Sequence, residues 1–410
     1  MKEFKIAFPE IDQSYSLMDL QKTVKGNVKQ ITGNIVTVLL NPKYCKAKKI
    51  YEGQIFYDKF TNEIKFQGKI IGEKSIKTNQ IRLWDDSLNN RIGLEIEKHF
   101  GLNYNANKMW DAVRFVANQY EISPPEQYLK NLTWKGDRNA IAKLLPIYLG
   151  AEDTELNAWI MEHMILGLIK RVFEPGSKFD EMMVLVGGQG IGKSTFARYL
   201  AIRDDWFCTI ENIQGKDAVM NLMGKTVVEI EEFVALRNAK SANEAKSFLS
   251  KLSDRIRIPY EKFSTDVPRT CILIGTLNER TFLNDHTGER RYLPVECHKE
   301  NRKKAIYPDK DYQGNQSEKD YLDSIRENFN QALAYGYKLY KDKKHSWTIP
   351  KELLKDLYQE QEKFKYLNPD VEDIRYFLEE YKVKTQEPNI TCFKELSMQG
   401  YQIKSKSFSE

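Results

Sequence analysis

The sequence predicts an α/β protein whose central part is a mostly parallel sheet. Three short apolar runs, at residues 182–186, 226–230 and 271–277, alternate with stretches of helical periodicity. Runs of this length are typical of strands buried on both faces, and their alternation with helices is typical of parallel sheets. Directly after the first run, residues 187–194 fit the phosphate-loop pattern G-x-x-x-x-G-K-[ST]. Nucleotide sites lie at the carboxyl ends of such strands.

The composition is that of a folded protein with more than one domain. The chain has 410 residues, of which 41% are hydrophobic and 12% aromatic, enough for two or three packed cores. Because it has no run of eighteen apolar residues and no apolar leader, we expect no membrane span and a cytoplasmic location. The net charge of +5 is too small to predict nucleic acid by itself. The five cysteines are far apart and indicate reduced thiols rather than disulfides or zinc ligands.

Changes of pattern along the chain predict four regions. Alternating residues at 34–39 and 53–57 indicate strands. Apolar residues then recur at three- and four-residue spacing over 94–120 and 138–171, which predicts helices broken at Pro124-Pro125. The expected regions are a β-rich start at 1–98, a helical domain at 99–171, a phosphate-loop ATPase core at 172–298, and a helical region at 299–410 with helices at about 318–341 and 350–381.

The phosphate loop joins the first apolar run to a helix-forming run that starts at Thr195. Its glycines let successive backbone N–H groups turn toward phosphate oxygens, and the helix amino terminus adds partial positive charge. We expect Lys193 to reach the β- and γ-phosphates and the Ser194 hydroxyl to bind Mg²⁺. ATP and Mg²⁺ are therefore the predicted cofactors. The predicted nucleotide-binding residues are Gly187, Gly188, Gln189, Gly190, Ile191, Gly192, Lys193, Ser194 and Thr195.

Polar side chains end the next two apolar runs. Glu229 lies near the end of the second run, and Glu231 and Glu232 follow it. One carboxylate at such a place holds Mg²⁺, directly or through water, while another orients the attacking water. Asn278 follows the third run, where its amide is suited to hydrogen-bond the γ-phosphate or the water. Solvated glutamates at a strand end are the alternative interpretation.

Two basic segments accompany these strands. Arg290 and Arg291 offer adjacent guanidinium groups that suit a transferring phosphoryl group, in a neighbouring subunit, although a surface ion pair also explains them. Residues 255–263 interleave basic and aromatic residues, as a loop that follows phosphates and stacks bases does. We predict Arg257 and Lys262 as its DNA contacts. An amphipathic strand pair at the surface is the alternative.

This ordered set of motifs resembles the virulence-associated protein E family, replicative helicases of phages and pathogenicity islands that are related to superfamily 3 helicases. The resemblance covers most of the chain and is more specific than the phosphate loop alone. The motifs that carry it are YLKNLTWKG (128–136), FEPGSKFD (173–180), GGQGIGKST (187–195), VVEIEEF (228–234), RIPYEKF (257–263), ILIGTLN (272–278) and TGERRYLPV (287–295).

The resemblance implies an AAA+-like core that forms a ring, commonly a hexamer, around DNA and hydrolyses ATP between subunits. Lys262 stands where related helicases have a DNA-contacting hairpin lysine. Which of Glu231 and Glu232 activates water, and which arginine acts in trans, stay open. The implied catalytic residues are Lys193, Glu229, Glu232, Asn278, Arg290 and Arg291, and the implied metal ligands are Ser194 and Glu229.

The resemblance also implies a helicase that serves replication of a mobile element in the cytoplasm of a bacterial host. Residues 1–98 show no primase motif, so a separate primase or initiator is the expected partner besides DNA.

Two other functions remain open from the sequence. A phosphate-loop phosphotransferase would act on a small molecule and would not respond to DNA. A DNA-binding or assembly protein would use ATP only as a conformational ligand. The basic stretch 255–262 counts against the first, and intact Lys193, Glu229 and Asn278 count against the second.

Overall fold

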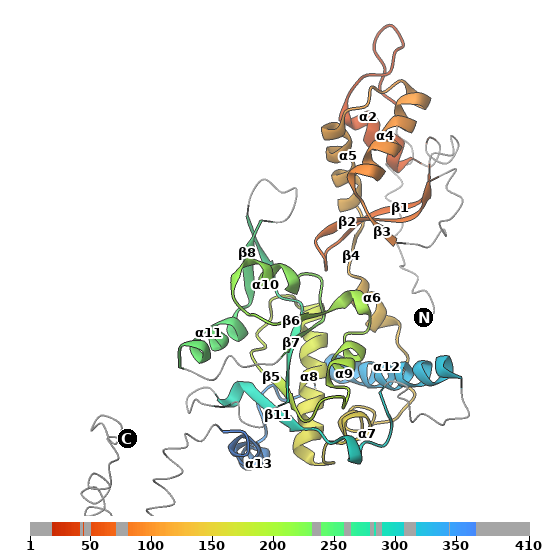
Figure 1. Ribbon diagram of the computed structural model, residues 1–410. Coiled ribbons are helices and arrows are strands. Elements are labelled where there is room, and N and C mark those ends of the chain that lie inside the picture. The colour runs from red at the N-terminus through yellow and green to blue at the C-terminus, as the bar shows by residue number, and fades with distance from the viewer. Residues whose placement is uncertain are drawn as a thin grey trace, which may run out of the picture.

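Figure 1 shows the computed structural model of the chain, with a small amino-terminal module joined to a larger α/β domain. The residues that the structure describes are 19–41, 44, 51–70, 81–231, 239–257, 264–278, 283, 289–306, 317–343 and 345–365.

Within its described residues, the amino-terminal module packs three helices on a four-stranded sheet. The strand order is β3-β2-β1-β4, in which β1 and β2 form an antiparallel hairpin and β4 runs parallel to β1. One hydrophobic cluster, extending to Ile122, joins the helices to the sheet. The elements are α2 (Thr32–Leu40), β1 (Tyr51–Asp58), β2 (Glu63–Ile70), β3 (Ile81–Leu83), α4 (Asp86–Phe100), α5 (Ala106–Asn118) and β4 (Glu121–Ile122).

The module differs from the sequence prediction in one element and in its extent. Residues 34–39, predicted as a strand from their alternation, form part of α2 instead. The same residues also satisfy helical spacing, because Ile35, Val38 and Leu39 fall on one face and are buried; packing of that face outweighs the strand preference of β-branched residues. The predicted boundary at 98 falls inside α4 and assigns α5 to the helical domain that follows. In the structure, both helices pack within the amino-terminal module.

Three helices connect the module to the central sheet. The pair Pro124-Pro125, predicted to break a helix, begins α6 (Pro124–Asn131), where a missing N–H costs nothing. The short helix α7 (Leu144–Leu149) follows. The long helix α8 (Glu155–Phe173) begins at Thr154, whose hydroxyl accepts the Asn157 N–H at 3.1 Å, and most of its residues are buried. This helix is the centre of the larger domain (Figure 1).

The larger domain is built on a five-stranded, all-parallel sheet of order β11-β5-β10-β7-β6. The three strands predicted from apolar runs are confirmed to within one residue. The strands are β5 (Met182–Val186), β6 (Phe207–Ile210), β7 (Val227–Glu231), β10 (Ile272–Leu277) and β11 (Tyr292–Glu296).

Alternate residues of these strands enter separate cores on the two faces of the sheet. Met183 and Leu185 pack in the cluster with α8, whereas Met182 and Val184 pack in the cluster with α11 (Ala239–Ser250). Burial on both faces explains why the strands have continuous apolar sequences.

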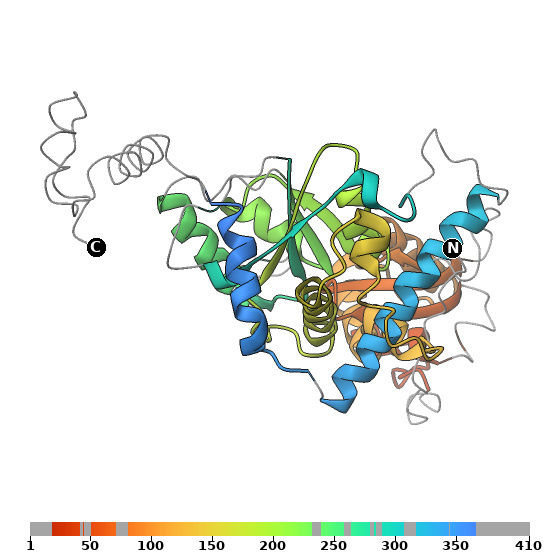
Figure 2. The ribbon, with the colours of Figure 1, turned by 90° about the horizontal axis from the view of Figure 1, so that it is seen from below.

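The remaining elements flank this sheet. Figure 2 shows α12 (Glu318–Asp342) and α13 (Lys351–Glu362) on opposite sides of α8, which is seen almost end on. The strands β8 (Ser253–Ile256) and β9 (Thr265–Pro268) form a separate antiparallel hairpin. The carboxyl-terminal helix, predicted over about 350–381, instead ends at Glu362, and the structure describes the chain only as far as 365. Within the described residues, no helix is long and apolar enough to cross a membrane.

The turn of the β1–β2 hairpin attaches the module to the larger domain. Phe60 is buried in the core of that domain, with its ring 6.0 Å from the Trp206 ring. Asp58 accepts the Phe60 N–H at 3.0 Å and so fixes the turn, and Lys59 pairs with Glu126 at 2.9 Å.

Candidate functional site

The glycine-rich loop begins where β5 ends and leads into α9 (Lys193–Leu200). Gly192 has φ 104°, a left-handed conformation that side chains other than glycine rarely adopt. Gly187 lies so close to the strand end of β11 that an added Cβ would be 2.4 Å from the Cys297 carbonyl oxygen. The predicted motif therefore has a strand-loop-helix context, as a phosphate site requires.

Lys193 is held over the loop by three oxygen acceptors. Its Nζ donates to the carbonyls of Gly187 at 2.5 Å and Gly188 at 2.9 Å, and to Asn278 Oδ1 at 3.0 Å. The side chain is only 8% exposed. Burial lowers the pKa of Lys193, against the opposing effects of Cys297 and Glu229. The structure thus brings together the loop lysine and the predicted sensor amide.

The carboxylate of Glu229 lies beside this lysine site and is 1% exposed. Hydroxyl groups from three elements donate to it. Ser194 and Thr276 donate to Oε1 at 2.6 and 2.8 Å, and Thr209 donates to Oε2 at 3.2 Å. Neutral donors stabilise a buried carboxylate without neutralising its charge.

Ser194 and Glu229 are a suitable pair of ligands for Mg²⁺. A hydroxyl and a carboxylate are hard oxygen donors, and their oxygens are 2.6 Å apart. Mg²⁺ at phosphate sites takes few protein ligands and completes its shell with water and phosphate oxygens. The described residues contain no group of three or more His, Cys, Asp or Glu side chains that could hold a metal ion by themselves.

Two small cavities adjoin the loop at the carboxyl edge of the sheet. One, of about 320 Å³, is lined by residues 189–195 with Glu231, Thr276 and Asn278. The other, of about 260 Å³, is lined by residues 186–189 and 296–300 together with Ile191 and Asn278. Glu231 therefore faces the loop, whereas Glu232 lies outside the described residues. All of the predicted nucleotide-binding residues line one or both cavities.

Thr209 and Thr276 were not assigned from the sequence. Thr276 lies in the motif ILIGTLN, one strand position from the end of β10. A hydroxyl residue at the carboxyl end of a buried strand, close to Asn278, was a signal by which the sequence could have identified it. Thr209 is an ordinary residue of β6, and only the pairing of β6 with β7 brings it to Glu229.

The arginine pair lies at the opposite edge of the sheet. Arg290 and Arg291 precede β11, whose first residue Tyr292 is paired with Met182 at the start of β5. The phosphate loop follows the other end of β5, about 16 Å away at roughly 3.3 Å per residue. In this structure Asp180 contacts both arginines, each at 3.1 Å.

The predicted DNA-contacting segment is described only in part. Arg257 is exposed and directly follows β8, while Lys262 lies outside the described residues. Arg255 and Asp266 face each other across the hairpin at 3.9 Å.

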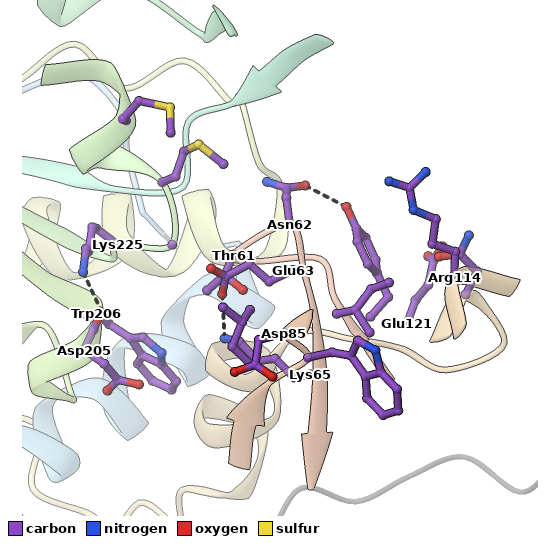
Figure 3. A pocket seen from close by; sticks show the side chains of 18 of the residues that line it. Thr61, Asn62, Glu63, Lys65, Asp85, Arg114, Glu121, Asp205, Trp206 and Lys225 are labelled. Carbon is purple, nitrogen blue, oxygen red and sulfur yellow. Dashed lines mark hydrogen bonds and ion pairs between the residues drawn. The ribbon is translucent and has the colours of Figure 1, made fainter. Parts of the chain in front are cut away.

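A larger cleft of about 810 Å³ lies between the module and the larger domain, away from the phosphate loop. Figure 3 shows Trp206 and Lys225 on one side of it, the hairpin residues Thr61 and Asn62 in the middle, and Arg114 beyond them. Acidic and basic side chains both line this cleft, and none of them belongs to the phosphate-loop motifs.

Comparison with known proteins identifies one family. The model of the virulence-associated protein E-like domain matches residues 129–366. Among solved structures, the apo structure of the NrS-1 C-terminal region has 16% identity and a TM-score of 0.48, with 88% of this chain and 85% of that chain covered. The A-form apo structure of the same region has 14% identity, a TM-score of 0.48 and the same coverage. No curated protein matches the chain.

Proposed function

The chain belongs to the virulence-associated protein E-like family, and on that premise we propose that it is an ATP- and Mg²⁺-dependent DNA helicase. The observation that carries the proposal is the contact set at the carboxyl edge of the sheet. There the loop lysine meets the amide of Asn278, and the loop serine meets the buried Glu229. Lysine, sensor amide, hydroxyl and acid are the groups that phosphoryl transfer from ATP uses.

Each of these groups has a distinct role in the proposed reaction. Lys193 exchanges its loop carbonyl acceptors for β- and γ-phosphate oxygens, and Asn278 orients the γ-phosphate or the attacking water. Ser194 and Glu229 would hold Mg²⁺, which neutralises charge that develops on the phosphates. Glu231 or Glu232 would orient the water, as a carboxylate beside the phosphate site can.

The strand order supports an AAA+-like core. The phosphate-loop strand β5 lies between β11, which follows the arginines, and β10, which ends in the sensor amide; the acidic strand β7 is one further across. This order places the acid and the amide on the same side of the loop.

The position of the arginines supports hydrolysis between subunits. Because Arg290 and Arg291 lie a full strand length from their own phosphate loop, they would reach the γ-phosphate of a neighbouring chain instead. We therefore propose a ring, a hexamer by family resemblance, that encircles DNA. Its other partners would be a separate primase or initiator, in replication of a phage or mobile element within the bacterial cytoplasm.

Steady-state ATP hydrolysis by the purified chain, with and without single-stranded DNA, tests the proposal, with Lys193→Ala as the control. We expect turnover that requires Mg²⁺, rises with DNA and disappears in the control. Strand displacement and oligomer size with nucleotide are then measured on the same preparation.

Two outcomes would contradict the helicase. ATP turnover that is the same with and without DNA would favour a small-molecule phosphotransferase. ATP binding without turnover would favour a DNA-binding or assembly protein whose conformation changes when ATP binds.

A further inference from the structure

The edge of the sheet opposite the phosphate loop contains a cluster of charged side chains around Asp180, whose role the proposed reaction has not yet assigned. Asp180, just before β5, is 5% exposed. Its Oδ2 accepts a hydrogen bond from Arg290 Nη2 at 3.1 Å and lies 3.1 Å from Arg291 Nε. A single carboxylate therefore holds the whole arginine pair.

The two arginines differ strongly in exposure. The side chain of Arg290 is 60% exposed, whereas that of Arg291 is 18% exposed. A guanidinium has five donors in a rigid plane, so a bond from one of them to Asp180 fixes the direction of the group and leaves others for an anion. Arg290 is thus directed outward, and Arg291 supports the same carboxylate from inside.

The backbone that carries Asp180 is itself fixed by a buried arginine of α8. Arg171 is 2% exposed, and burial lowers its pKa. Its Nη2 donates to the carbonyl of Phe179 at 2.7 Å and its Nη1 to the carbonyl of Cys271 at 2.9 Å. It therefore ties the segment before β5 to the segment before β10.

The segment before β10 is the base of the β8–β9 hairpin. There Arg269 and Asp254 form a buried ion pair at 2.7 Å. Gly176, in the motif FEPGSKFD, donates its N–H to the Arg269 carbonyl at 2.9 Å. Gly176 has φ 78°, and an added Cβ would be 3.2 Å from Pro268. The motif loop thus fits against the hairpin base.

We propose that Asp180 is a positioning residue that directs Arg290 to the nucleotide of a neighbouring chain, with Arg171 holding its backbone to the hairpin base. Arg290 is then the arginine that acts in trans, and Arg291 is the support. The proposal rests on the proposed function, because it requires hydrolysis between subunits.

The test uses Asp180→Asn in the full-length chain, because asparagine keeps the shape and removes the charge that attracts the arginines. We expect DNA-stimulated turnover to fall by roughly 10²-fold, as a misdirected group typically costs, while ATP affinity stays within about twofold of wild type. The matched control is Glu327→Gln, which removes the acid of an exposed ion pair with Lys135 and is expected to change neither quantity.

Mixing of chains separates positioning from damage to the fold. Lys193→Ala chains bind no productive nucleotide but keep their arginines, so adding them to Asp180→Asn chains should restore turnover at the intact phosphate loops of the latter. Arg290→Ala chains should be rescued in the same way, and Arg291→Ala should lower the melting temperature more than Arg290→Ala does.

Three results would overturn the proposal in distinguishable ways. If Lys193→Ala chains rescue Arg290→Ala but not Asp180→Asn, Asp180 acts on the phosphate loop of its own chain and does not position Arg290 for a neighbour. If Arg291→Ala, and not Arg290→Ala, is rescued, the assignment of the two arginines is reversed. If no mixture restores turnover, the proposal of hydrolysis between subunits is contradicted, and so is the positioning role that rests on it. Should Asp180→Asn not fold, Asp180→Glu, with a displaced carboxylate, is tested in the same mixtures.

Discussion

The two edges of the central sheet each contain a buried acid, but the partners of these acids differ. At the carboxyl edge, Glu229 accepts hydrogen bonds from three neutral hydroxyl groups, so its charge remains available to a cation. At the amino edge, Asp180 is matched by Arg290 and Arg291, so its charge is used to orient them. The carboxyl edge is therefore suited to bind a cation, and the amino edge is suited to present a guanidinium group. Such a division agrees with the proposal that neighbouring chains hydrolyse ATP between them.

Glu229→Gln tests the first half of this comparison and should have the largest effect. The amide keeps the size of the side chain but removes the charge that a divalent cation needs, so we expect turnover to fall by roughly 10²–10³-fold. ATP affinity measured without Mg²⁺ should change little, because Lys193 and the loop N–H groups remain.

The matched variant at the other edge is Asp180→Asn, measured in the same assay. Its turnover should be restored by mixing with Lys193→Ala chains, whereas that of Glu229→Gln should not. Equal rescue of both variants would remove the distinction between the two edges.

Arg269→Met tests whether the amino edge is a structural unit. Removing one partner of a buried ion pair costs about 3–5 kcal/mol, and Lys251, 3.5 Å from Asp254, limits the loss to the lower end. We expect the free energy of unfolding, measured in denaturant, to fall by about 3 kcal/mol. The double variant with Asp254→Leu should recover part of it, because no buried charge is then left unpaired. Unchanged stability of Arg269→Met would show that the pair does not support the hairpin base.

The sequence predicted the carboxyl edge much better than the amino edge. Each part of the phosphate site is a contiguous motif at the end of an apolar run, and the structure brings these motifs together through the contacts of Lys193 with Asn278 and of Ser194 with Glu229. Asp180 and Arg290 are 110 positions apart, and only strand pairing brings them together. The order of the five strands likewise depends on long-range pairing that local periodicity does not contain.

The amino-terminal module shows the other limit of sequence reasoning. Residues 34–39 satisfy both the strand and the helix pattern, and their helix is selected by burial against α5 rather than by local preference. Asn34 then holds the preceding loop, because its side chain donates to the carbonyls of Gln21 and Lys29 at 2.9 and 2.8 Å. No local signal identifies such a contact before the fold is known.

Thr276→Val sharpens the comparison within the carboxyl edge. It removes one of the two hydroxyls on Glu229 Oε1 while keeping the shape of a β-branched strand residue. A hydrogen bond to a charged group contributes about 1.5–3 kcal/mol, so we expect a loss of stability near the lower value and a reduction in turnover of about tenfold. Thr270→Val, which removes a hydroxyl bonded to the Lys225 carbonyl instead, is the control and should leave turnover unchanged.

The smallest effect that we predict is a pH dependence of stability that arises at the amino edge. His163 is buried beside Glu181, the neighbour of Asp180, with its Nδ1 3.0 Å from His345 Nε2. Burial lowers the pKa of His163, opposed by Glu181 and assisted by His345 and Lys170.

Because the pKa of His163 is lower in the folded chain than in the unfolded chain, the unfolded chain binds more protons near the ordinary histidine pKa of about 6.5, and stability must fall as pH falls through that range. The slope from this one group is at most about 1.4 kcal/mol per pH unit. Melting temperatures between pH 8 and pH 5 should therefore decline less steeply for His163→Gln than for wild type. Identical slopes would mean that His163 does not contribute to the pH dependence of the amino edge.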